Sequence, residues 1–168
     1  MHDKDAANTT PGGDRVNGVN ELSLEQAHVF VNSALKQQEK LKTRPRILVV
    51  EDDPSLAQLI GNYLTAHEYT VVIASTGELA VTTLKDFIPD LVVLDLELSG
   101  TLTGWDVLQV LRRNVSVPVL LTTSMTLNVR KYLRTSGETR LTLDHLPKPY
   151  PVQALLRRIK RMLMIAPS

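Results

Sequence analysis

Leu91-Val92-Val93-Leu94-Asp95 is the stretch that decides the fold, because four large apolar residues in a row leave a strand no polar face. A strand of this kind is buried on both sides, as in the parallel sheets that helices cover. An unpaired charge is costly to bury, so Asp95 is expected where the strand leaves the sheet. That place is the carboxyl edge, at which open α/β sheets bind their ligands.

Short apolar runs alternate with segments of helical period on both sides of this strand, from Arg46 onward. The pattern predicts strands over residues 47–50, 71–74, 91–95, 117–121 and 141–146. It predicts helices that begin at Pro54, Gly77, Thr126 and Pro151, the second of them reaching Phe87, and a further helix through residues 107–111 after a turn over residues 99–104. This alternation is typical of an α/β fold with a parallel sheet.

The chain divides by composition into three parts. Residues 1–22 are polar and contain too few large apolar groups to offset the entropy of ordering, so a disordered tail is predicted. Residues 23–45 are predicted to form a helix and a linker, because Ser23 and Gln26 fit a capping box and Pro45 breaks the helix. Residues 46–168 contain the strands and are predicted to form one domain.

The composition excludes several classes of site and partner. The 168 residues include no cysteine, which excludes disulfides and thiolate zinc sites and suits a reducing cytosol. The 19 basic and 18 acidic residues nearly cancel, and the basic cluster over residues 157–161 is most simply the solvent face of a helix, so nucleic acid is not an expected partner. No apolar run approaches the ~20 residues of a membrane helix. A cytoplasmic protein without membrane contact is expected.

Polar and charged residues follow the predicted strands at one edge of the sheet. They are Glu51-Asp52-Asp53 after the first strand, Asp95 on the third, Thr122-Thr123-Ser124 after the fourth and Lys148 after the fifth. The ends of parallel strands meet at one edge, so these groups are expected to converge. Each has an ordinary interpretation when taken alone: the acids as a helix start, with Asp53 as its cap, Thr123 as a strand-end hydroxyl, and Lys148 as a loop lysine.

The convergent acids indicate a cation, because clustered carboxylates raise each other's pKa unless a positive charge lies between them. Oxygen ligands without cysteine or a nearby histidine favour a hard ion such as Mg²⁺. A carboxylate beside Mg²⁺, a lysine and hydroxyl donors is suited to attack phosphorus and to hold an acyl phosphate. The sequence therefore predicts phosphoryl chemistry at this edge.

Four motifs resemble the receiver domain of two-component response regulators, over about Arg46 to Met164. They are residues 47–54 (Ile-Leu-Val-Val-Glu-Asp-Asp-Pro), 91–95, 118–123 (Pro-Val-Leu-Leu-Thr-Thr) and 146–149 (Leu-Pro-Lys-Pro). The resemblance implies a flavodoxin-like (βα)5 fold, with a doubly wound parallel sheet of five strands in the order 2-1-3-4-5. It also implies a phosphoryl group received from a sensor histidine kinase or a phosphotransfer protein.

The same resemblance gives each acid a role. Asp95 would be the phosphoacceptor and Asp52 a direct Mg²⁺ ligand. Glu51 would help to hold the ion through water, and the backbone carbonyl of Glu97 would complete the protein's share of the ligands. The expected metal set is therefore Glu51, Asp52, Asp95 and the Glu97 carbonyl.

A switch is implied as well. Thr123 matches the hydroxyl residue that moves to the phosphoryl group, Lys148 the cation that binds it, and His145 the usual aromatic switch position. The sequence departs from the family pattern in the turn from Ser99 to Gly104, which is longer than usual and has serine where proline is common. It departs again in the interval from Thr123 to Lys148, longer by about one helical turn, and at His145, where tyrosine or phenylalanine is usual.

Three functions are compatible with these residues. The favoured one is a stand-alone receiver that switches protein contacts, because nothing follows Ser168 in the sequence. The second is a receiver-shaped docking protein that has lost switching, although the intact set of Asp95, Thr123 and Lys148 argues against it. The third is a phosphohydrolase of the haloacid dehalogenase type, which would need its Asp-x-Asp motif on the first strand rather than Asp95-Leu96-Glu97 on the third. We therefore expect no enzyme beyond Mg²⁺-dependent self-phosphorylation and autodephosphorylation.

The expected partners are the phosphodonor, an unidentified downstream protein and a second copy of the chain. Apolar residues over 24–41 recur near the spacing of a coiled coil for about two and a half heptads. So short a helix is marginal alone in water, so it is expected to pair with a second chain, or else to dock back on its own domain. The face formed by residues 126–163 is the alternative surface for a homodimer.

Overall fold

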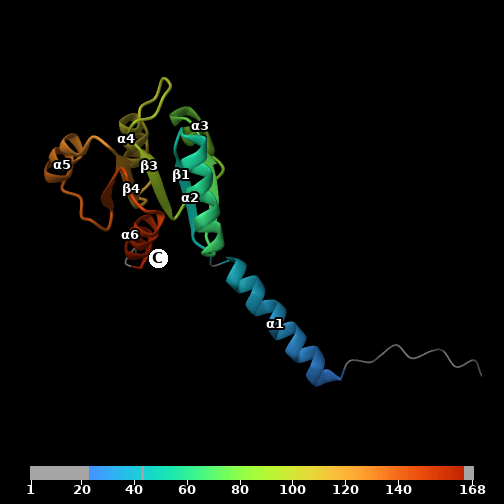
Figure 1. Cartoon of the computed structure of the whole chain (residues 1–168). Coiled ribbons are helices and arrows are strands. Elements are labelled where there is room, and N and C mark those ends of the chain that lie inside the picture. The colour runs from blue at the N-terminus through green and yellow to red at the C-terminus, as the bar shows by residue number, and fades with distance from the viewer. Residues whose placement is uncertain (1–22, 43, 165–168) are drawn as a thin grey trace, which may run out of the picture. The chain divides into compact units, whose positions relative to one another are not determined.

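The computed structural model of the chain describes residues 23–42 and 44–164 (Figure 1). The chain divides into two units between Lys42 and Thr43, and each is described by itself. The tail predicted over residues 1–22 lies outside the described residues. Within the described ranges, no helix is long and apolar enough to cross a membrane.

Helix α1 (Leu24–Lys42) is the described part of the first unit. The Ser23 hydroxyl oxygen accepts from the Gln26 N–H at 3.2 Å, and the Gln26 side-chain oxygen accepts from the Ser23 N–H at 3.2 Å. These bonds confirm the predicted capping box. Several apolar side chains of α1 are more than half exposed: Leu24, Val29, Phe30, Val31 and Leu35. An exposed apolar surface of this kind is typical of a protein contact.

A parallel sheet forms the centre of the second unit. Its strands are β1 (Arg46–Val50), β2 (Thr70–Ala74), β3 (Leu91–Asp95), β4 (Val119–Thr123) and β5 (Leu143–Pro147). Their order in the sheet is β2-β1-β3-β4-β5, with every neighbouring pair parallel, which confirms the predicted flavodoxin-like fold (Figure 1). β3 lies in the middle, and all of its residues are buried, as a continuous apolar run requires.

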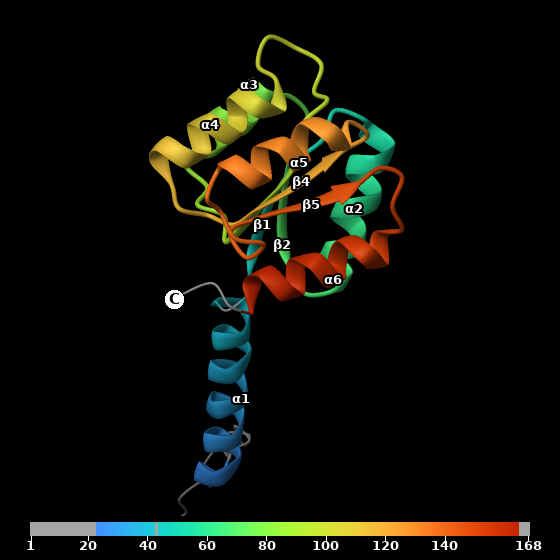
Figure 2. The same cartoon turned by 90° about the vertical axis from the view of Figure 1, so that its left-hand side faces the viewer.

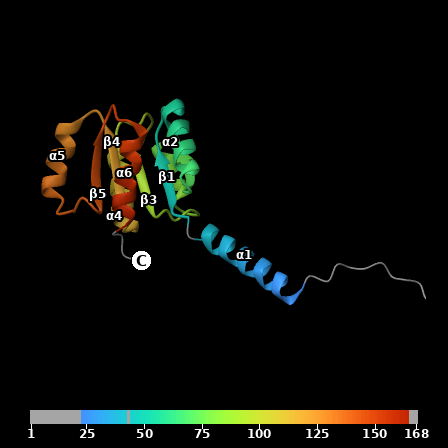
Figure 3. The same ribbon diagram turned by 60° about the horizontal axis from the view of Figure 1, so that its bottom comes forward.

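Helices cover both faces of the sheet. They are α2 (Pro54–Ala66), α3 (Gly77–Thr83), α4 (Gly104–Asn114), α5 (Thr126–Thr135) and α6 (Val152–Leu163). α2 and α6 pack on one face, whereas α3 and α4 pack on the other (Figures 2 and 3). Side chains alternate along a strand, so Val92 and Leu94 join the core under α4, while Leu91 and Val93 join the core under α6.

The boundaries of β4 differ from the predicted ones. The prediction covers residues 117–121, whereas the strand spans Val119–Thr123. Pro118 has no N–H to donate, so the ladder toward β5 opens with Val119, whose N–H donates to the Thr142 carbonyl oxygen at 2.9 Å. The strand ends in two buried threonines, which a search for apolar runs leaves out.

Two other elements are shorter than predicted. β5 begins at Leu143 rather than Leu141, because a turn precedes it in which the Leu143 N–H donates to the Thr139 carbonyl oxygen at 2.9 Å. α3 ends at Thr83 rather than Phe87, and the Phe87 N–H closes the following turn on the Thr83 carbonyl oxygen at 2.9 Å. In both places hydrogen bonds of a turn replace those of the predicted element.

The interval from Thr123 to Lys148, which the sequence predicts to be longer than the family pattern, consists of α5 and its connection to β5. α5 forms over its predicted residues, 126–135, and the turn after it passes through Gly137, whose φ of 71° favours glycine. Arg112, in the last turn of α4, donates to both Glu138 carboxylate oxygens at 2.9 and 2.7 Å. The same guanidinium donates to the Val117 carbonyl oxygen, before β4, at 2.9 Å and to the Thr142 carbonyl oxygen, before β5, at 3.0 Å. The Arg112 side chain thus holds the connection between α5 and β5 in place.

Gly104, the first residue of α4, touches the end of β3. A Cβ atom at this position would overlap the Asp95 carbonyl oxygen and lie 2.5 Å from the Leu96 Cα. Both are backbone atoms of the segment that carries the candidate site, so neither can move aside without displacing it. The close approach of α4 to β3 therefore requires glycine.

Replacing Gly104 with alanine should lower the free energy of unfolding by about 1–3 kcal/mol, the usual cost of overpacking. Gly61→Ala is the matched control, because a Cβ there would meet only the end of the Ile73 side chain, at 2.9 Å, and alanine favours the helix. Urea unfolding followed by circular dichroism measures both variants. Equal stability of the two variants would contradict the backbone contact.

Candidate functional site

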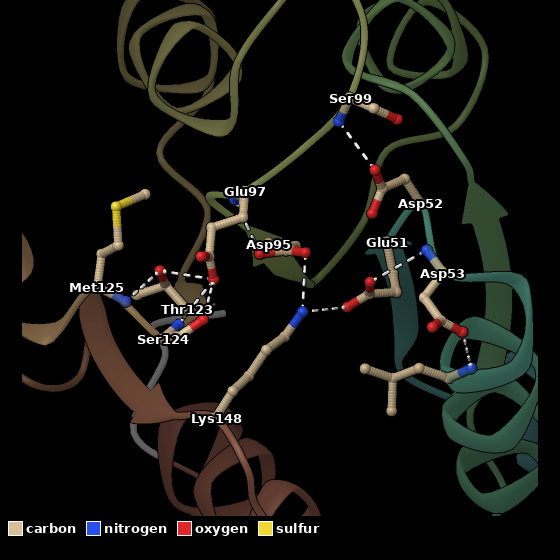
Figure 4. Close-up of polar contacts among 11 residues, drawn as sticks. Glu51, Asp52, Asp53, Asp95, Glu97, Ser99, Thr123, Ser124, Met125 and Lys148 are labelled. Carbon is tan, nitrogen blue, oxygen red and sulfur yellow. Dashed lines mark hydrogen bonds and ion pairs between the residues drawn. The ribbon is translucent and has the colours of Figure 1, made fainter.

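Side chains from four strands meet at the carboxyl edge of the sheet (Figure 4). Asp95 is the last residue of β3, and Thr123 is the last residue of β4. Glu51 and Asp52 follow β1, and Lys148 follows β5. The structure thus brings together the acids, the hydroxyl and the cation that the sequence predicts at one edge.

Lys148 joins two buried acids. Its Nζ donates to Asp95 Oδ2 at 2.8 Å and to Glu51 Oε2 at 3.0 Å. Both acids are only 2% exposed, and buried charges are stable only when they are paired and hydrogen-bonded. Burial alone would lower the pKa of Lys148, but the hydrogen bonds with Asp95 and Glu51 outweigh it and raise this pKa above its usual value. Lys148 is therefore a permanent cation at this edge.

The acids still outnumber the cation. Burial raises the pKa of Glu51; the hydrogen bond from Lys148 opposes this, and the charge of Asp95 adds to it. One oxygen each of Glu51, Asp52 and Asp95 lies within 4.8 Å of the others. A set of carboxylate oxygens this close fits a hard divalent cation such as Mg²⁺, which would neutralise the excess charge.

Asp52 is held by the loop that follows β3. Its Oδ2 accepts from the Ser99 N–H at 2.8 Å, and hydrogen bonding from Ser99 lowers the pKa of Asp52. Ser99 stands where the family pattern has proline, and proline has no N–H to donate. This departure from the pattern therefore supplies a hydrogen bond to a candidate metal ligand.

Asp53, the third acid of the run, is a helix cap. Its Oδ1 accepts from the Leu56 N–H at 2.8 Å, which confirms the ordinary interpretation of this residue. Its own N–H donates to Glu51 Oε1 at 3.2 Å. Asp53 thus starts α2 and orients Glu51 at the same time.

The hydroxyl of Thr123 is buried and engaged. It donates to Glu97 Oε2 at 3.2 Å and accepts from the Met125 N–H at 2.9 Å (Figure 4). Glu97 Oε2 also accepts from the Ser124 N–H at 2.7 Å and from the Ser124 hydroxyl at 2.6 Å. These bonds, those of the Ser124 N–H first, lower the pKa of Glu97, so its carboxylate stays ionised.

The sequence prediction assigns only the backbone carbonyl of Glu97 and leaves out its side chain. Asp95 pairs with Thr122 in the register of β3 and β4, so the residues that follow each strand lie side by side. The signal in the sequence is an acid two places after Asp95 and a hydroxyl two places after Thr122. The carbonyl's role as a metal ligand stays a prediction, although the Glu97 N–H fixes this turn by donating to Asp95 Oδ1 at 2.9 Å.

His145 occupies the predicted switch position on β5, opposite Leu121 of β4. The side chain is half-buried, and no other described residue offers its Nε2 a hydrogen bond. Burial lowers the pKa of His145, and the positive charges of Arg130 and Arg158 add to this, although Asp144 opposes it. The ring is therefore neutral near pH 7, and its role as a switch stays a prediction.

The basic cluster of α6 is only partly a solvent face. Arg157 and Lys160 are exposed, as predicted. Arg158 is half-buried and donates to Asp144 Oδ2 at 2.6 Å, and Arg161 pairs with the same oxygen. The prediction is wrong for the half-buried Arg158, whereas Arg161 is exposed as predicted. Both arginines pair with Asp144 because it is buried on β5 and a buried carboxylate needs positive partners.

A pocket of about 400 Å³ opens beside Lys148. Leu56, Ser124, Pro149 and Tyr150 complete its lining. Burial raises the pKa of Tyr150 to about 12, so this phenol stays neutral. The pocket places an apolar surface next to the cation that holds Asp95.

Comparison with known proteins finds response regulators among the relatives of this chain. The family profile described as the response regulator receiver domain matches residues 47–160. The DNA-binding response regulator MtrA of Mycolicibacterium smegmatis is 37% identical over 120 residues, which are 71% of this chain and 51% of MtrA. The transcriptional regulatory protein BaeR of Escherichia coli is 34% identical over 119 residues, which are 71% of this chain and 48% of BaeR. The chain thus spans about half the length of these curated relatives.

Solved structures share the fold. The receiver domain of the Francisella response regulator 1452 is 27% identical and superposes with a TM-score of 0.63, covering 72% of this chain and 98% of that one. The chemotaxis response regulator CheY4 of Vibrio cholerae is 24% identical with a TM-score of 0.63, covering 72% of this chain and 100% of that one. The second likeness is one of fold alone.

Removing the charge of Asp52 should weaken Mg²⁺ binding at least about tenfold, since a ligand charge near the ion is lost and each 1.4 kcal/mol is a factor of ten. Asp52→Asn keeps the size of the side chain, and Asp53→Asn is the matched control, because asparagine still caps α2. The single tryptophan, Trp105, follows Gly104 and gives a fluorescence signal for the titration. Equal Mg²⁺ affinities of the two variants would remove Asp52 from the metal site.

Proposed function

This chain belongs to the response regulator receiver domain family, and on that premise we propose that Asp95 accepts a phosphoryl group from a histidine kinase or a phosphotransfer protein. The observation that carries the proposal is the setting of Asp95, a buried carboxylate at the end of the central strand. A lysine ammonium lies 2.8 Å from it, and two more acids lie within reach of a shared cation. A lone structural aspartate would need the ammonium but not the two additional acids.

In the proposed reaction, one oxygen of Asp95 forms a bond to phosphorus while the bond between phosphorus and the donor's nitrogen or oxygen breaks. The leaving group keeps the electron pair of that bond. Mg²⁺, held by Glu51, Asp52, Asp95 and the Glu97 carbonyl, would supply positive charge to the phosphoryl oxygens. Lys148 already touches Asp95, so its ammonium is placed to neutralise the charge that the phosphoryl group brings.

The proposed output is a change in protein contacts. A phosphoryl group adds about 1.5–2 negative charges and three acceptor oxygens at the end of β3. Thr123, at the end of the neighbouring strand, would turn its hydroxyl to these oxygens, and Lys148 would stay bound to them. Movement at the end of β4 would be passed to α5 and to His145 on β5, which form part of the proposed binding face over residues 126–163.

The family assignment bears on the competing functions. A phosphohydrolase of the haloacid dehalogenase type has no support in a match that covers residues 47–160 of this chain. The relative MtrA is described as DNA-binding. This chain spans about half of MtrA, so DNA binding is not carried over to this chain. A receiver that acts without an attached output domain, and a cytoplasmic location, stay predictions for this chain.

Incubation with acetyl phosphate and Mg²⁺ should add one phosphoryl group to the protein, in a bond that is stable to acid and labile to base, as acyl phosphates are. The group should be absent without Mg²⁺, because the clustered acids otherwise repel an anionic donor. Mass spectrometry of the intact protein measures it. The matched pair of variants is Asp95→Asn and Asp86→Asn, the latter at an exposed carboxylate outside the site. A phosphoryl adduct that persists in Asp95→Asn would contradict the proposal.

We also expect α1 to pair two chains, because its exposed apolar residues would be buried in a helix dimer. Deletion of residues 1–42 should leave a receiver that is still phosphorylated on Asp95, with a mass in solution that falls from dimer to monomer. In the full chain, Val31→Glu should have the same effect, while Asn32→Glu adds the same charge away from the apolar seam. Sedimentation equilibrium gives the mass. A dimer that survives the deletion would point to the 126–163 face, and a monomeric full-length chain would favour docking of α1 on its own domain.

A further inference from the structure

Glu97 forms a three-point contact that the reaction proposed above does not use. A single oxygen, Oε2, accepts from the Thr123 hydroxyl, the Ser124 N–H and the Ser124 hydroxyl, at 3.2, 2.7 and 2.6 Å (Figure 4). Three donors that converge on one oxygen form a binding site for an anion. In this structure the anion is the chain's own carboxylate.

The backbone holds Glu97 in this position from both sides. The Leu96 N–H donates to the Thr122 carbonyl oxygen at 3.1 Å, which extends the pairing of β3 with β4 past Asp95. The Glu97 N–H then donates to Asp95 Oδ1 at 2.9 Å. The turn therefore begins at Asp95, and the side chain of Glu97 extends from this turn to the end of β4.

We propose that the Glu97 carboxylate is an internal competitor of the phosphoryl group, which occupies the donors of Thr123 and Ser124 until Asp95 is phosphorylated. The inference rests on the proposed function of Asp95. The Thr123 hydroxyl has one proton to donate, so it serves either Glu97 or a phosphoryl oxygen, but never both. Phosphorylation must therefore break the contact with Glu97 before Thr123 can turn.

Charge strengthens this competition. The phosphoryl group adds about 1.5–2 negative charges two residues from the Glu97 carboxylate, and like charges so close repel each other. Glu97 is exposed, so its carboxylate can leave the donors for water. The contact thus stabilises the unphosphorylated state and lowers the share of protein that a given amount of phosphodonor converts.

A purely structural role of Glu97 makes a different prediction. Met125, the residue before α5, gives this helix no side-chain cap, so Glu97 also ties down the turn that leads into the helix. If that were its only role, removing the carboxylate would loosen the turn and weaken the binding of a phosphoryl group. The competitor predicts the opposite sign, a gain in affinity.

Beryllium trifluoride, an anion that mimics a phosphoryl group on a carboxylate, tests the sign at saturating Mg²⁺. In the full-length protein, Glu97→Ala should bind it at least about tenfold more tightly, because hydrogen bonds to a charged group no longer have to break. Glu97→Gln should gain less, since its amide oxygen can still accept. Asp86→Ala, which removes an exposed carboxylate from the turn before β3, at the opposite edge of the sheet, should bind as the parent protein does.

Amide resonances give an independent readout. In the unliganded Glu97→Ala variant, the Ser124 N–H signal should move toward the position of a solvent-bonded amide, because it loses a carboxylate acceptor at 2.7 Å. Equal or weaker binding of beryllium trifluoride by Glu97→Ala, with the parent binding normally, would overturn the competitor and leave the proposed function intact. Absence of binding in both proteins would overturn both.

Discussion

The pairing of Lys148 with Asp95 is the contact on which the rest of the site depends. A strand of continuous apolar residues carries Asp95 into a position that is 2% exposed, and a carboxylate there requires a cation. Lys148 follows β5, whereas Asp95 ends β3, and β4 lies between these two strands. The lysine side chain must therefore pass the end of β4, where Thr123 stands and accepts the Lys148 N–H on its carbonyl oxygen at 3.0 Å. The ion pair thus links three strands.

The loop after β3 is fitted to the same edge. Gly104 brings α4 against the backbone of Asp95, so the loop has to turn back within a few residues. Glu78 at the start of α3 holds its far end, since Glu78 Oε1 accepts from the N–H groups of Thr101 and Leu102 at 3.0 and 2.9 Å. Asp52 holds its near end through Ser99. The loop between β3 and α4 is thereby held by two acids, Glu78 and Asp52, and Asp52 is a candidate metal ligand.

The polar groups at this edge divide into two sets with different duties. Three acids, Glu51, Asp52 and Asp95, lie close together, and Lys148 bonds to only two of them, Glu51 and Asp95, which makes the edge receptive to a metal ion and then to an anionic donor. Thr123 and Ser124 instead provide hydrogen-bond donors that need an acceptor, and the Glu97 carboxylate is that acceptor. When the Glu97 carboxylate occupies the donors of Thr123 and Ser124, a phosphoryl group must displace it. A receiver whose donors are free imposes no such competition.

The features that depend on local pattern could be predicted from the amino-acid sequence. The apolar run before Asp95 indicated a buried strand, and the alternation of apolar runs and helical periods indicated the α/β class. The family resemblance carried by the four motifs predicted the strand order and named the residues expected at the site. The structure alone decided the start of β4 after Pro118, the contact of Glu97 with Ser124, the bond from Ser99 to Asp52 and the pairs of Asp144 with α6. Burial and periodicity act between neighbours in the chain, so a sequence displays them. A hydrogen-bond partner depends on the register of strands and on loop lengths, which only the folded chain sets.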